Sequence, residues 1–335
     1  MKIPFLTALA FLPLGASCFH TLESRREPSR EQKLDLYTTT ATYLYEDGDL
    51  ERAQQQAVKA LEIDPDHRTM RRMIGWIRLR LGSNEDVIYA EDFFNRLIED
   101  GDDSPATVLG LAIAYERLGN AYDVLGRAIE ADRHMPEKGV EVEDSAADKR
   151  ATAERYWNKA IVLLEGLLRN GEGNTDAMNA LQRVYAALER FDESLAWSEK
   201  LLERSEAELE TWQRMLTSEH LTDEEEEFFR NNQESAHRLR TQTHLFAATL
   251  LFKHRRHRDA LLHLDAVVAG SPNLPEAYSI RGQLLFRLGE FQRAMDDLDR
   301  FLSLSEASNE HPDILRAFDM RNRCEQELAS TRRRG

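Results

Sequence analysis

Two segments near opposite ends of the chain share one pattern of small and apolar residues. In LYTTTATYLYEDGDLERAQQQAVKALEIDP, Gly48 precedes Ala53 by five positions, and in PEAYSIRGQLLFRLGEFQRAMDDLDRFLSL, Gly289 precedes Ala294 by the same spacing. Apolar residues follow each alanine at the fourth and seventh positions, which is the spacing of one helix face. A pattern that returns along a chain predicts a stack of similar units rather than one globular core.

These segments resemble the tetratricopeptide repeat, a helix–turn–helix unit of about 34 residues. In that family the first helix follows W-x₂-L-G-x₂-Y, and the second follows A-x₃-F before a closing proline. Matches to the first helix are Tyr37/Thr40/Ala41/Leu44, Val108/Leu111/Ala112/Tyr115, Met178/Leu181/Gln182/Tyr185, His244/Ala247/Ala248/Leu251 and Tyr278/Arg281/Gly282/Leu285. Matches to the second helix and its closing proline are Ala53/Ala57, Ala160/Leu164, Ala260/Leu264, Ala294/Leu298, Pro65 and Pro272. The resemblance implies an all-α fold, a right-handed α-solenoid; a generic helical bundle is the alternative.

The repeat body predicted for residues 34–329 divides into about seven units and a final helix. The units are 34–67, 68–104, 105–173, 175–207, 208–240, 241–274 and 275–308. The unit at 208–240 is degenerate and is placed there because the frame requires it, although Thr222 and Glu225 form a capping-box pattern that begins a helix. Residues 312–328 are predicted to form an amphipathic helix that caps the last repeat, and 330–335 form a basic tail.

The third unit is longer than the others because an acidic loop, 134–146, separates its two helices. Insertions in solenoids often lie on a functional face. This loop is therefore the place for a second hypothesis, in which the chain is a regulatory or substrate-presenting subunit of an exported enzyme. A weak catalytic or sugar-binding site would then use His134, Glu137, Glu141 and Glu143.

The first 17 residues have the pattern of an export signal: Lys2, an apolar run and then small residues. Cys18 follows directly, and this arrangement resembles the lipobox of bacterial lipoproteins, although Gly15 stands where that family prefers leucine. The resemblance implies that Cys18 is lipidated and that residues 18–33 are a polar tether. Phe19 favours the outer membrane over the inner membrane. Simple export to a secreted or periplasmic form, a buried N-terminal strand and residence in the cytosol are the alternatives.

The composition narrows the range of partners. The net charge is −16, so the overall field of the protein repels phosphate backbones and disfavours nucleic acid as a ligand. Two cysteines are too few for a disulfide framework, and the second of them, Cys324, is expected to be a half-buried or free thiol. Beyond residue 17 no apolar run approaches the roughly 20 residues that span a bilayer.

No catalytic motif is found, so we predict no enzyme activity, no cofactor and no metal. The sequence has no glycine-rich phosphate loop, no G-x-S-x-G and no HExxH. The acidic run 223–227 is interpreted as a solvated first turn of a helix. The basic run 253–258 is interpreted as a solvated turn, with a docking patch for an acidic partner or anionic lipid as the alternative.

In tetratricopeptide repeats the first helix of each unit faces the concave groove. The residues that this frame places there are Tyr45, Trp76, Arg80, Glu116, Arg183, Phe252, Gln283 and Arg287. Aromatic and arginine side chains are common in protein-binding surfaces. The sequence therefore predicts a protein-interaction scaffold of the bacterial cell envelope, facing the periplasm, that binds a protein or peptide and no small-molecule substrate. The alternative is a soluble adaptor without a lipid anchor.

Overall fold

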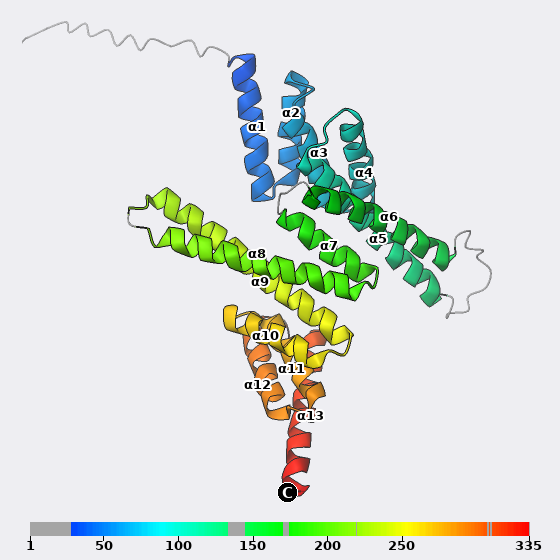
Figure 1. Cartoon of the computed structure of the whole chain (residues 1–335), viewed down its shortest axis with the longest axis vertical. Coiled ribbons are helices and arrows are strands. Elements are labelled where there is room, and N and C mark those ends of the chain that lie inside the picture. Colours follow the sequence, from blue (N-terminus) through cyan, green and yellow to red (C-terminus); the bar gives the residue numbers. More distant parts are fainter. Residues whose placement is uncertain are drawn as a thin grey trace, which may run out of the picture. The chain divides into compact units, whose positions relative to one another are not determined.

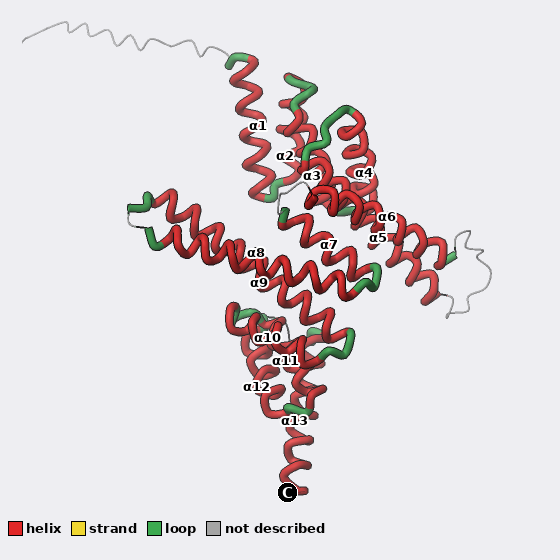
Figure 2. Tube along the Cα trace, in the orientation of Figure 1, coloured by secondary structure: helices red, strands yellow, loops and turns green. Residues whose placement is uncertain are grey.

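The computed structural model describes residues 28–132, 145–169, 174–218, 220–306, 308 and 310–334. Within these ranges the chain forms thirteen α-helices and no strand (Figures 1 and 2). The helices are α1 (Arg30–Asp47), α2 (Leu50–Ile63), α3 (Arg68–Leu81), α4 (Asn84–Glu99), α5 (Pro105–Asp132), α6 (Ala146–Arg169), α7 (Thr175–Ala187), α8 (Phe191–Leu216), α9 (Asp223–Lys253), α10 (His257–Gly270), α11 (Pro275–Leu288), α12 (Phe291–Leu304) and α13 (Pro312–Arg334). The expected all-α fold is confirmed.

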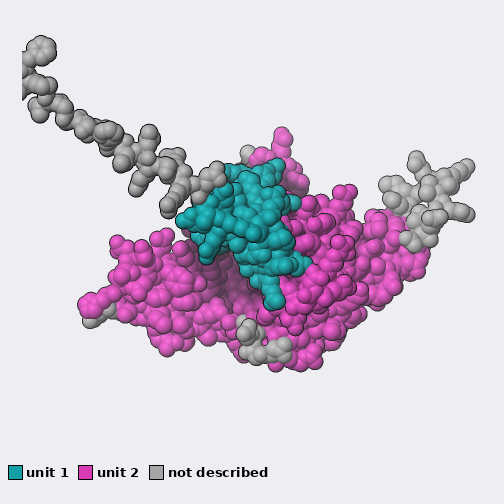
Figure 3. Space-filling view, turned by 90° about the horizontal axis from the view of Figure 1, so that it is seen from above, with its two compact units in different colours: residues 1–73 teal, residues 74–335 magenta. Residues whose placement is uncertain are grey.

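The chain divides into two compact units, which Figure 3 colours separately. Unit 1 ends at Met73 and holds α1, α2 and the start of α3, whereas unit 2 begins at Ile74 and holds the remaining helices. In unit 1 the Arg30 guanidinium donates a hydrogen bond to the carbonyl of Ile63, and this bond joins the beginning of α1 to the end of α2.

The repeated glycines and alanines have the same structural roles in both units. Gly48 and Gly289 end the first helix of their hairpins with φ of 90° and 79°, a left-handed conformation that glycine adopts without strain. Ala53 and Ala294 then lie fully buried near the start of the second helix. In the last hairpin a Cβ at Gly282 would lie 3.1 Å from Leu298, so small residues allow the two helices to approach closely.

In unit 2 each helix from α4 onward packs against the next one along the chain. First helices of neighbouring hairpins also touch, α5 against α7 and α11 against α13. This pattern, in which contacts stay between neighbours, is that of an α-solenoid of helix hairpins. The last helix, α13, covers the final hairpin with Ile314, Ala317 and Cys324, all buried. Burial raises the pKa of the Cys324 thiol.

The unit expected at 208–240 forms a hairpin around the turn between α8 and α9, but it has no separate helices. Its first half is the end of α8 and its second half is the start of α9, so each of these helices is shared with a neighbouring unit. With 26 and 31 residues, these two helices are about twice as long as the 14-residue helices of the last hairpin. The capping box at Thr222 and Glu225 is confirmed, and it begins α9 after a turn.

Two helix ends differ from the sequence prediction, and several predicted features lie outside the described residues. α1 begins at Arg30, capped by Ser29, so the end of the expected tether is helical. α13 is longer than expected and extends through residues 330–334, where a tail was expected. The export signal, Cys18 and most of the 134–146 loop, with its four candidate side chains, lie outside the described residues.

Candidate protein-binding face

Two of the expected groove residues bind each other across neighbouring hairpins. The Arg183 guanidinium of α7 donates two hydrogen bonds to the Glu116 carboxylate of α5, Nε to Oε1 at 2.6 Å and NH2 to Oε2 at 2.8 Å. Glu116 is only 4% exposed. Bidentate pairs of this kind fix geometry strongly, and the pairing raises the pKa of Arg183 against the opposing effect of its burial. This pair therefore orients one hairpin against the next.

A second pair of expected groove residues is in contact nearer the C-terminus. The Arg287 guanidinium of α11 lies over the ring of Phe252 in α9, 4.6 Å from its centroid. Such a cation–π contact is attractive because the ring face is electron-rich. Both pairs join first helices of consecutive units, so the two members of each pair lie beside each other. A groove that contains all the candidates stays a prediction.

The remaining groove candidates differ in their surroundings. Trp76 is half-buried and packs edge-on against Phe94, with ring centroids 5.9 Å apart. Arg80 lies one turn further along α3 and is exposed. Tyr45 is half-buried and belongs to unit 1. Binding of a partner by these side chains stays a prediction.

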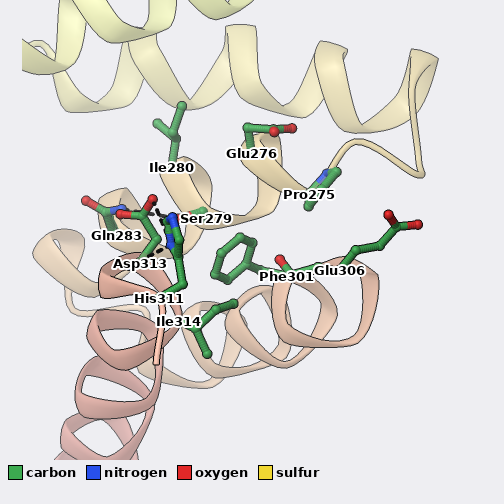
Figure 4. Close-up of a pocket in the computed structure, with 11 residues that line it drawn as sticks. Pro275, Glu276, Ser279, Ile280, Gln283, Phe301, Glu306, His311, Asp313 and Ile314 are labelled. Carbon is green, nitrogen blue, oxygen red and sulfur yellow. Dashed lines mark hydrogen bonds and ion pairs between the residues drawn. The ribbon is translucent and has the colours of Figure 1, made fainter. Parts of the chain in front are cut away.

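Gln283 lines a pocket of about 470 Å³ at the C-terminal end of unit 2 (Figure 4). The pocket lies between the start of α11, the end of α12 and the start of α13. Phe301 and Ile314 lie beside each other on the α12 and α13 side, and Pro275 and Glu276 stand on the α11 side. A second pocket, of about 240 Å³, also contacts Gln283 and continues along α13.

The lining of the larger pocket combines apolar and acidic groups. Ile280, Phe301 and Ile314 supply apolar surface from three helices. Glu276, Glu306 and Asp313 add carboxylates, and Asp313 lies 3.7 Å from the His311 ring while its backbone N–H donates to His311 Nδ1. An apolar recess with a negative rim fits a side chain that has an apolar body and a positive end.

Some histidines of the sixth expected unit lie at the turn between its helices, and two others pair between the helices. The basic run 253–258 forms the turn between α9 and α10, as expected. His244 and His263 face each other across these two helices, with their Nδ1 atoms 2.9 Å apart. Burial, then His263 and Arg240, lower the pKa of His244 to about 4. This pair was not expected, although the i and i+19 positions on consecutive helices were visible in the sequence.

None of the described helices combines the length and apolarity needed to cross a bilayer. Among the same residues, no group of three or more His, Cys, Asp or Glu side chains has the arrangement of a metal site.

Residues 38–105 and 247–311 match the family model described as tetratricopeptide repeat. These two segments carry the tetratricopeptide repeat pattern. The first segment covers the second half of α1 and all of α2, α3 and α4, and the second covers the end of α9 and all of α10, α11 and α12. Repeats of this kind stack into extended surfaces that bind other proteins, which agrees with the face described above. No curated protein has a sequence that matches this chain.

Solved structures that resemble this chain include tetratricopeptide repeat proteins. A tetratricopeptide repeat protein from Parabacteroides merdae ATCC 43184 is 14% identical, covers 87% of this chain and 99% of its own, and has a TM-score of 0.36. YrrB, described as a TPR protein with an unusual peptide-binding site, is 17% identical, with coverages of 84% and 90% and a TM-score of 0.34. TTC0263, a thermophilic TPR protein from Thermus thermophilus, is 14% identical, with coverages of 90% and 100% and a TM-score of 0.29.

Proposed function

We propose that the chain is a non-catalytic scaffold that holds a segment of another protein on the first-helix face of unit 2. The observation that carries this proposal is the pocket lined by the groove candidate Gln283 and bounded by three helices. The face leading to it is preorganised, because the Glu116–Arg183 and Phe252–Arg287 pairs hold consecutive hairpins together. Preorganised surfaces bind with a smaller entropic cost.

The pocket selects part of the bound segment. A lysine or arginine, with its aliphatic stem against Phe301 and Ile314, would place its charge near Glu276 or Glu306, because Asp313 already pairs with Arg316 at 3.2 Å. The acidic balance of the whole chain favours the approach of such a segment. We therefore expect bound peptides to be enriched in basic residues.

The test is selection of phage-displayed random peptides on the full chain, followed by binding measurements with the selected peptides. Gln283→Trp fills the space that the two pockets share, and we expect at least about a tenfold loss of affinity, or ~1.4 kcal/mol. Gln326→Trp places the same side chain on an exposed part of α13 away from both pockets and serves as the control. Equal binding by both variants, or selected peptides without basic residues, would refute the pocket assignment.

We propose that the protein is located in the bacterial envelope, with Cys18 as the lipid anchor. What supports it is sequence alone: the export-signal pattern of residues 1–17 and the cysteine behind it. Stable anchoring requires more than one acyl chain, which a lipoprotein N-terminus carries. The mass of the mature N-terminal peptide, from wild type and Cys18→Ser, tests this directly. An unmodified Cys18 in a soluble protein would leave a soluble adaptor as the proposal.

A further inference from the structure

The distal halves of α8 and α9, residues 205–236, form a hairpin that we call the acidic arm. Its residues come from the stretch that the repeat frame assigned to an additional unit. Three aromatic rings gather near its tip: Trp212 lies 6.1 Å from Phe228 and 6.0 Å from Phe229, and the two phenylalanines lie 5.8 Å apart. These rings come from both helices of the arm.

The apolar surface at this tip is open. Phe228 is 57% exposed and Met215, three residues beyond Trp212 on α8, is 46% exposed. In the arm only Ser205, Leu209 and Ala236 are buried among the described residues. Trp212 and Phe229 pack across the two helices and are partly buried, whereas Phe228 and Met215 leave apolar surface in solvent. Large exposed apolar groups gathered in one place mark interaction surfaces.

The arm also carries an unusual share of the negative charge. Residues 205–236 contain ten acids and two arginines, so their net charge is −8, half of the −16 of the whole chain. Arg230 pairs with Glu226 one turn before it on α9, and this pair leaves the excess of carboxylates unchanged. A partner that covers the tip must therefore tolerate or neutralise the negative electrostatic potential of these carboxylates.

We propose that the acidic arm is a docking surface for a basic amphipathic helix of a partner protein. A helix with leucine-like residues on one face would lie across Trp212, Met215 and Phe228, and lysines or arginines at its edges would meet the carboxylates. A second copy of the chain fits poorly, because it would bring two charges of −8 together. An anionic membrane would be repelled for the same reason. This surface is separate from the pocket beside Gln283, so either proposal can fail alone.

The probe is a synthetic peptide of about 18 residues, five helical turns, with leucine on one face and lysine on the other. Its binding to the full chain is followed by fluorescence anisotropy at low and high salt. A peptide with the same leucine face and glutamates in place of lysines is the charge control. We expect the lysine peptide to bind, its affinity to fall with salt, and the glutamate peptide not to bind.

Variants locate the binding. Phe228→Ser removes the exposed ring, and we expect the Kd of the lysine peptide to rise at least about tenfold. Leu262→Ser removes an exposed apolar side chain from α10, where Leu262 is 70% exposed, and should change the Kd less than about twofold. Circular dichroism confirms that both variants are folded. Equal effects of the two variants would overturn the proposal.

Charge is tested in the same way. Glu224→Gln with Glu227→Gln neutralises two exposed acids of the arm, whereas Glu51→Gln with Glu62→Gln removes the same charge from α2. Only the arm variant should weaken the lysine peptide substantially. Sedimentation of the wild type and of Phe228→Ser, and flotation with phosphatidylglycerol vesicles, test the other occupants. Self-association through Phe228, or vesicle binding lost in Phe228→Ser, would overturn the proposal in favour of a second copy or a membrane.

Discussion

Unit 2 contains two long hairpins, α5–α6 and α8–α9, and they use their extra length differently. In α5–α6 the side chains satisfy one another: Tyr122 and Tyr156 stack with centroids 5.7 Å apart, Lys149 lies over the Tyr122 ring, and Arg150 pairs with Glu130 across the helices. In α8–α9 the distal half exposes Phe228 and carries a net charge of −8. The first hairpin pairs its aromatic and charged groups across the two helices, although aliphatic side chains such as Val124 and Val162 are exposed, whereas the second exposes an aromatic ring within a strongly negative segment.

The difference illustrates two effects that extra residues can have in a repeat protein. Extra residues that supply their own core lengthen a hairpin and stabilise it, as Trp157 does where α6 packs on α5. Extra residues that leave aromatic groups in solvent add exposed apolar surface, and surface of this kind marks interaction sites. Substitutions in the two hairpins should therefore have different effects on the free energy of unfolding.

The largest effect is expected from Trp157→Ala. Trp157 is 4% exposed, packs within the main core of unit 2, and donates its indole N–H to Asn120 at 3.0 Å. Its removal should cost about 3–5 kcal/mol of unfolding free energy. Trp212→Ala in the acidic arm should cost about 1 kcal/mol or less, because that ring is partly solvent-exposed. Urea unfolding of both variants measures the contrast, and similar losses would remove the distinction between the hairpins.

The next effect concerns the close approach of α5 and α6. A Cβ at Gly119 would lie 2.5 Å from the Trp157 ring, so Gly119→Ala should destabilise the protein by about 1–3 kcal/mol through overpacking. Gly166 lies in the same hairpin, in α6, with nothing within 4 Å of its Cβ position. Gly166→Ala should therefore stabilise by roughly 0.5–1 kcal/mol, as alanine does inside a helix. Thermal unfolding that moves both variants in the same direction would show that α5 and α6 are not packed this closely.

The sequence predicted the packing positions better than the lengths of helices. Ala53, Ala260 and Ala294 were expected as small contact residues and are fully buried, because close helix approach demands small side chains wherever it occurs. The unit at 208–240 shares its helices with the neighbouring units for a reason visible in the residues. No glycine or proline interrupts 191–216 or 223–253, so the chain had no breaker to end either helix where the period required it.

The site was less accessible to prediction than the fold. Glu116 and Arg183 were placed on the same face, but their pairing depends on the rotation between two hairpins, which a pattern of residue types does not specify. The pocket depends on where α13 docks: Ile314 and Asp313 line it only because the cap helix lies beside α11 and α12. The charged tip of the acidic arm was interpreted as a solvated first turn, and its aromatic neighbours on α8 were too distant in sequence to alter that interpretation.

A third prediction separates the two halves of α9 by pH. His244 lies in the half that packs on α10, and its pKa of about 4 is below the value of about 6.5 in an unfolded chain. As pH falls below about 6.5 the unfolded state takes up the proton first, so stability that is fully present above that pH is lost progressively down to about pH 4. We expect a loss of about 1–2 kcal/mol, reduced from the full shift because the ring is partly solvated. Urea unfolding at about pH 7 and about pH 5 measures it.

The control for this prediction is His244→Gln, which retains a hydrogen-bonding group beside His263 but does not titrate. The charged groups around the pair are Arg240, which opposes protonation of His244, and Glu199 and Asp259, which favour protonation of His263. The variant should show a flatter pH dependence than the wild type over the same range. An unchanged slope would assign the pH dependence to other groups.

The smallest effect is expected at the tip of the acidic arm. The Thr222 hydroxyl accepts from the backbone N–H of Glu225, whose carboxylate accepts from the Thr222 backbone N–H, and this backbone bond is the main reason that the pKa of Glu225 is lowered. Thr222→Ala should cost the first turn of α9 about 1 kcal/mol. Because the arm lies beyond the stacked part of the repeats, this cost should remain local. Amide hydrogen exchange should accelerate at 223–230 and stay unchanged in α10, whereas faster exchange in both would mean that the arm and the repeats unfold as one body.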